Sequence, residues 1–226
     1  GEVSAQTAGH RRVQSRRQQA EALSSARQIF EREGMLKTRR GPTGLYSAPR
    51  PAAADTESFD LGFAFVSAMC LASRSHEDAA TNAKAIVELA YLIERLESRP
   101  EEAAALQKVL RMVVRGSGTG MQRGETVQRV MKSYGDGLKG EAQWYFNSGV
   151  TVSRLFLATY LNDGDGMRIE LQNLQLLTKI APQNVPRDVL APMQSLLRYF
   201  DQTTFTEGDR AAVIEAIDKI IVTVMA

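Results

Sequence analysis

Paired arginines near the N-terminus are the residues best able to do chemistry in this 226-residue chain. Arg11-Arg12 and Arg16-Arg17 are five residues apart, and Arg39-Arg40 follows. In a helix the first two pairs would form a cationic face, and the planar guanidinium suits two-pronged contacts with phosphate. Neutralising a polyphosphate releases counterions, which gives salt-sensitive, sequence-independent affinity. We therefore expect Arg11, Arg12, Arg16, Arg17, Arg39 and Arg40 to contact the backbone of RNA or DNA. Docking on an acidic protein surface and a plain solvated tail stay open as alternatives.

Three further arginines are candidate contacts on the rest of the chain. Arg154 lies among apolar residues, so its guanidinium must be paired, directed outward, or placed against an anion in a groove. Trp144 and Tyr145 precede it and could lie beside such a groove, although aromatic residues in a helical bundle are more often core. Arg115 precedes the glycine-rich stretch 116–124, Arg123 lies within it, and both could also contact an anion or a partner.

Two glycine-rich segments look like binding loops but fail the tests of their motifs. Residues 116–124 contain no Gly-Lys-Ser/Thr and follow an expected helix, so they do not form a phosphate loop. We expect them to be a flexible loop between helices. Residues 162–166 contain two aspartates, but an EF-hand loop counted from Asp163 would place Arg168 at its glycine and Leu174 at its glutamate. We expect a helix stop followed by an aspartate N-cap.

The residues of nucleophilic and metal chemistry are scarce. Cys70 lies between apolar neighbours in the most apolar segment, so we expect a core residue rather than a reactive thiolate. The two histidines, His10 and His76, do not accompany a Ser or Cys in any arrangement typical of nucleophilic catalysis. Paired carboxylates stand at expected helix starts, where the helix dipole accounts for them. We expect no metal, no cofactor and no enzymatic activity.

Composition favours an ordinary globular protein of a reducing compartment. A single Cys excludes an intrachain disulfide framework, and too few His and Cys are present for a structural zinc site. The first residues carry no apolar stretch typical of a secretory signal. The most apolar segments are either too short or too polar to cross a bilayer, so we expect no membrane span. We expect a cytoplasmic or other reducing location.

Charge divides the chain into two parts. Residues 1–54 carry ten basic and four acidic residues, a balance of +6, and the rest carries 18 basic and 22 acidic residues, a balance of −4. A Gly/Pro/Ala stretch ends the first part. We therefore expect a basic N-terminal arm over residues 1–57 and a helical body over residues 58–226. Within the arm, Val13, Ala20, Leu23 and Phe30 predict one marginal helix over residues 11–33 that needs a partner to hold it.

The body is predicted to be all-α, a compact bundle of about eight helices. Apolar residues recur at helical spacing throughout, and no segment alternates as a strand does. Capping-box patterns begin at Ser98 and Thr206. We expect helices over residues 59–73, 79–97, 101–115, 127–134, 141–161, 167–180, 190–200 and 209–224. Repeats of the length that builds a solenoid are not apparent.

A basic arm before a helical body is similar to the layout of many coat and nucleocapsid proteins, and equally to that of bacterial adaptors and secretion regulators. The likeness concerns architecture alone. We expect a non-enzymatic assembly protein that self-associates, with the arm reaching RNA, DNA or a neighbouring subunit. The alternative is a protein–protein adaptor or regulator that docks through the arm or through residues 116–124.

Overall fold

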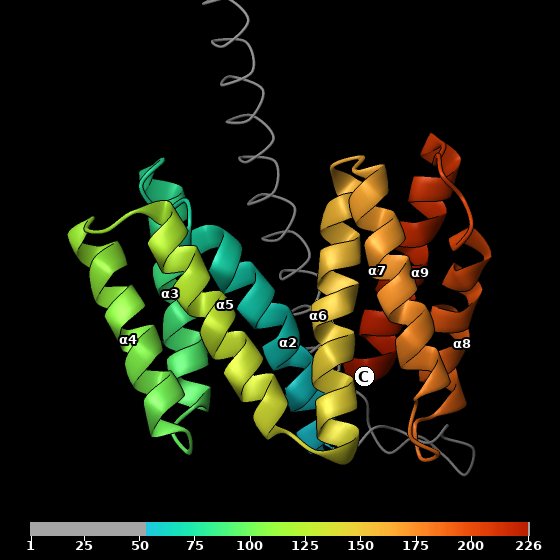
Figure 1. The fold of residues 1–226 in the computed structure, drawn as a ribbon, viewed down its shortest axis with the longest axis horizontal. Helices are drawn as coiled ribbons and strands as arrows, with labels where there is room; N and C mark the ends of the chain where they lie inside the picture. The colour runs from blue at the N-terminus through green and yellow to red at the C-terminus, as the bar shows by residue number, and fades with distance from the viewer. Residues whose placement is uncertain (1–52, 226) are drawn as a thin grey trace, which may run out of the picture.

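The computed structural model describes residues 53–225, and these form an all-α body, as predicted (Figure 1). Helical periodicity therefore gave the right fold class. The eight α-helices that it describes, with one short 3-10 turn called η1, are α2 (Ala53–Ala72), α3 (Ala79–Arg95), α4 (Pro100–Arg115), α5 (Gly120–Gly137), α6 (Gly140–Tyr160), α7 (Gly164–Lys179), α8 (Arg187–Leu196), η1 (Leu197–Tyr199) and α9 (Glu207–Met225). None of them is long and apolar enough to cross a membrane.

The helices form two groups of four that lie side by side. Helices α2 to α5 each pack on the helix before them, and α5 returns to α2. Helices α6 to α9 repeat this arrangement, and α9 returns to α6. In Figure 1, α3 to α5 lie on one side, α7 to α9 lie on the other, and α2 and α6 meet between them. Short connections between neighbours are what such bundles require.

The two groups are equivalent helix by helix. The starts of α6, α8 and α9 follow those of α2, α4 and α5 by 87 residues each, and α7 follows α3 by 85 residues. The caps correspond as well. Asp78 and Asp163 both cap the second helix of their group, accepting from Thr81 N and Gly166 N. Thr119 and Thr206 both open the fourth helix with a capping box. The chain therefore contains the same four-helix unit twice.

Helices α2 and α6 run in the same direction and touch through glycine. The two starts meet where Asp55 is hydrogen-bonded to Glu141, and both burial and this neighbouring carboxylate raise the pKa of Asp55. A Cβ added at Gly62 would overlap the carbonyl oxygen of Phe146, and one added at Gly149 would overlap that of Phe59. Because Phe146 and Gly149 lie 87 residues after Phe59 and Gly62, the contacts are reciprocal, as at an approximate two-fold axis.

Helix α2 is the buried centre of the body, as its all-round apolar sequence predicted. Phe59, Phe63, Phe65 and Val66 have no exposed surface. The ring of Phe65 lies 5.9 Å from that of Phe146 on α6, in an edge-to-face arrangement. This cluster joins the two four-helix units into one core.

Two local predictions were wrong. The segment 116–124 is not a loop throughout, because α5 begins at Gly120 and only four residues connect it to α4. Thr119 accepts from the backbone N–H of Gln122, and the Gln122 side chain accepts from the N–H of Thr119. This capping box starts the helix four residues before the last glycine of the stretch. The expected capping box at Ser98 is also absent, since α4 begins after Arg99 without a side-chain cap.

Candidate functional site

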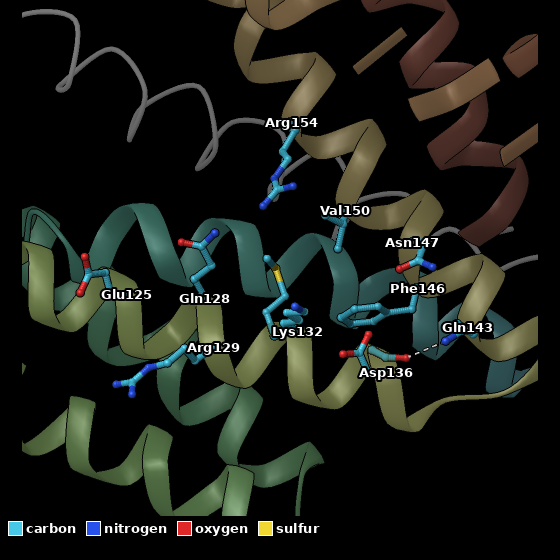
Figure 2. A pocket seen from close by; sticks show the side chains of 12 residues that line it. Glu125, Gln128, Arg129, Lys132, Asp136, Gln143, Phe146, Asn147, Val150 and Arg154 are labelled. Atoms are coloured by element: carbon cyan, nitrogen blue, oxygen red, sulfur yellow. Dashed lines mark hydrogen bonds between the residues drawn. The ribbon is translucent and has the colours of Figure 1, made fainter. Parts of the chain in front are cut away.

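A groove of about 670 Å³ lies between α5 and α6 (Figure 2). We call it the α5–α6 groove. Its volume is in the range of small-ligand sites. Helix α5 contributes Glu125, Gln128, Arg129, Met131, Lys132, Gly135 and Asp136, and α6 contributes Gln143, Phe146, Asn147, Val150 and Arg154.

Arg154 is the half-buried cation of this groove. Its side chain reaches from α6 towards the side of α5 that carries Gln128 (Figure 2). It forms no hydrogen bond and no ion pair with any residue of the described part of the chain. A half-buried guanidinium without a counter-ion is costly, and an anion bound beside it recovers that cost.

The charge of Arg154 affects the pKa of two ionisable groups on neighbouring helices. Arg154 lowers the pKa of the Cys70 thiol on α2 and of the Glu170 carboxyl on α7. Burial is the larger effect in both, so the pKa of Glu170 stays above its usual value and that of Cys70 rises to about 11. Glu170 is instead hydrogen-bonded by Asn173 at 3.2 Å. Glu170 therefore acts on Arg154 through its charge without forming an ion pair with it.

Further polar side chains line the groove around Arg154. Lys132 is exposed on α5 and forms no hydrogen bond or ion pair within residues 53–225. Arg129 lies on the outer edge and donates to Thr126 at 3.2 Å. The carboxylates of Glu125 and Asp136 lie towards opposite ends of the groove in Figure 2. Charged side chains of both signs therefore line the groove.

The floor of the groove is apolar and closely packed. Gly135 leaves room for the Phe146 ring, since an added Cβ would lie 2.8 Å from that ring. The Phe146 ring packs 5.2 Å from that of Tyr134, and its face is therefore taken by the core. Gln143 donates to the carbonyl of Gly135 at 3.2 Å and ties α6 to the end of α5. The groove is preformed, but it does not offer an aromatic face for stacking.

The other four-helix unit provides a comparison within the same molecule. Position 67 corresponds to Arg154, 87 residues earlier, and it is a serine with 1% of its surface exposed. Position 216, which corresponds to Arg129, is an alanine. The four-helix unit therefore does not require arginine at either place, whereas Lys132 has a lysine, Lys219, at its equivalent position.

The other two predicted arginines lie elsewhere. Arg115 is exposed at the end of α4. Arg123 is 1% exposed and donates to the carbonyls of Ala72 at 2.9 Å, Ser117 at 2.8 Å and Gly118 at 3.0 Å. Burial lowers its pKa. Its equivalent, Arg210, likewise donates to the carbonyl before its own helix, at Phe205. Arg123 thus holds the α4–α5 connection, and the structure does not bring it together with Arg154.

Replacing Arg123 with alanine should lower the stability of the body by roughly 3 kcal/mol, because buried carbonyls lose a charged donor and a cavity remains. Thermal unfolding measures this. The exposed Arg115→Ala variant removes the same charge and should unfold within about 1 °C of wild type. If Arg123→Ala unfolded at the same temperature as Arg115→Ala, that result would contradict a structural role for Arg123.

The remaining predicted residues fall into two groups. Trp144 and Tyr145 are core residues, and the indole of Trp144 donates to the carbonyl of Leu177 at 2.8 Å. Cys70 packs against the core, as predicted. The arginines of residues 11–40 lie outside the described residues. No group of three or more metal-ligating side chains occurs within residues 53–225.

Sequence reasoning singled out Arg154 but missed Lys132 and the polar side chains facing it. Lys132 and these side chains lie on α5, and the spacing of residues in the sequence does not show that α5 lies beside α6. We found no protein-family model, no curated protein and no solved structure that matches this chain.

Proposed function

We propose that this chain is a non-enzymatic helical binding protein that holds the phosphate backbone of RNA or DNA through its basic arm and the α5–α6 groove. The observation that carries the proposal is Arg154, a half-buried cation in a preformed groove that has no counter-ion among residues 53–225. Lys132 faces the same space, and residues 1–54 add a balance of +6.

The chemistry of the groove fits a backbone rather than a base sequence. Cations contact phosphate of any sequence, and sequence is read by contacts with base edges. The Phe146 ring is packed against Tyr134, so bases cannot stack on it. We therefore expect affinity without marked sequence preference and with a strong dependence on salt.

Fluorescence anisotropy of labelled single-stranded RNA and DNA over a salt series tests this proposal. We expect the logarithm of affinity to fall linearly with the logarithm of salt, by about 0.7 per phosphate contact. Changing Arg11, Arg12, Arg16 and Arg17 to Gln in the full chain should lower that slope by about 3. Absence of binding at low salt would overturn the proposal, and recovery of one acidic protein in its place would support an adaptor.

A further inference from the structure

Helix α7 has a second apolar face that the body does not cover. Its inner face packs Met167, Leu171 and Leu174 into the core without exposed surface. On the outer face Ile169 is 56% exposed, Leu176 is 58% exposed and Ile180, at the end of the helix, is 68% exposed. We call Ile169, Asn173, Leu176 and Ile180 the α7 seam. Large exposed apolar side chains in one row mark an interaction site.

The spacing of the α7 seam is that of a coiled-coil face. Its members follow one another at four, three and four residues, which is the alternation of a heptad repeat. Asn173 is the polar member, as is common at one position of such a seam. A helix with the same repeat is therefore the occupant that this face fits.

The equivalent helix of the other unit does not carry this face. Lys84, Glu88, Tyr91 and Arg95 of α3 stand 85 residues before the four seam residues. The Arg95 guanidinium covers the Tyr91 ring at 3.4 Å from its centroid. The fold therefore tolerates a polar face at this position, so packing within the body does not explain why the α7 seam is apolar.

We propose that the α7 seam is the docking site of the arm segment 11–33 of the same chain. Val13, Ala20, Leu23 and Phe30 follow one another at seven, three and seven residues and fall on one seam of a heptad. Arg16 and Arg27 take the intervening seam positions, where an arginine stem can pack while its guanidinium reaches water. The apolar row of segment 11–33 and that of the α7 seam are each narrow, and they share the same heptad spacing, so each can pack against the other.

The chain enters the body beside one end of the seam. Asp55, near the start of α2, is hydrogen-bonded to Glu141, which in turn accepts from Asn184 at 3.0 Å. Asn184 follows the end of α7 by five residues. Residues 34–52 lie between the two segments and span at most about 65 Å. Helix α7 is only about 24 Å long. A tether of this length gives a high local concentration, which favours the chain's own arm over that of a second copy.

Limited trypsin digestion of the full chain tests the docking. Cleavage after Arg27 and Arg32 should be slow in wild type and about tenfold faster in Leu176→Gln, because cleavage follows the undocked fraction. Tyr91→Gln, the equivalent change on α3, is the matched control and should leave the rate unchanged. Equal rates in wild type and Leu176→Gln, with both proteins folded, would overturn the proposal.

A cysteine pair then identifies the chain that supplies the arm. In a Cys70→Ala background, Leu23→Cys with Leu176→Cys should form an intrachain disulfide at low protein concentration. Leu23→Cys with Tyr91→Cys should not. A disulfide-linked dimer in place of the intrachain product would overturn the assignment to the same chain. Neither experiment involves nucleic acid, so its failure leaves the proposed function standing.

Discussion

Replacing Arg154 with glutamine should weaken the binding of single-stranded RNA about tenfold at low salt. The substitution removes the half-buried cation of the α5–α6 groove but keeps a side chain of similar reach. A hydrogen bond to a charged group contributes about 1.5–3 kcal/mol, and tenfold in affinity corresponds to about 1.4 kcal/mol. The salt dependence should also become shallower by roughly one phosphate contact. Anisotropy titrations at several salt concentrations measure both effects.

Two variants make the Arg154 result specific to the groove. Arg111 is exposed on α4 and away from the groove, so Arg111→Gln removes the same charge and should change affinity less than about twofold. Lys132→Gln should weaken binding in the same direction as Arg154→Gln, because both cations face one groove. Equal effects of Arg154→Gln and Arg111→Gln would mean that net charge, and not the groove, sets affinity.

Replacing Gly149 with alanine should destabilise the body by roughly 3 kcal/mol, a shift of about 10 °C in the unfolding midpoint. The added Cβ would overlap the backbone carbonyl of Phe59, which cannot rotate away as a side chain can. Helices α2 and α6 would then have to separate along the contact that joins the two four-helix units. Calorimetry or thermal circular dichroism measures the shift.

The matched control for this prediction is Gly164→Ala. Gly164 begins α7, and a Cβ there would meet only the Phe205 ring, at 3.8 Å. Alanine is also the better helix former, so Gly164→Ala should leave the midpoint unchanged or slightly raised. Gly62→Ala should behave like Gly149→Ala, because its Cβ would overlap the carbonyl of Phe146. If Gly149→Ala had the same unfolding midpoint as the Gly164→Ala control, the close approach of α2 and α6 would not limit stability.

Periodicity was sufficient to predict the helices because each one has to bury an apolar stripe in a common core. Residues 141–161 were expected to be helical, and α6 runs from Gly140 to Tyr160. An aspartate N-cap was expected within residues 162–166, and Asp163 is that cap, accepting from Gly166 N, although α7 begins at Gly164 and not at residue 167 as expected. The prediction was wrong at residues 120–124 because their glycines indicated a loop. The Thr119 capping box starts a helix there in spite of Gly120 and Gly124.

The groove and the repeated unit could not be predicted in the same way. Which helix lies against α6 is decided by the core, where Gly62 and Gly149 allow two backbones to meet. The equivalent residues that the two units share are few and scattered, such as the pair Arg123 and Arg210. Most other core positions keep only their apolar character, which any helical bundle would require. Arg154 was visible as an anomaly among apolar residues, but its surroundings were not.

Photo-crosslinking is the most direct test of the claim that the α5–α6 groove holds a nucleic-acid backbone. A single-stranded RNA that contains a photoreactive uridine would be bound to the full chain, irradiated, and the attached peptides identified by mass spectrometry. We expect crosslinks in the arm and in the segments of α5 and α6 that line the groove, Gln128–Asp136 and Gln143–Arg154. Crosslinks confined to the arm, or found on α8 and α9 instead, would contradict the account.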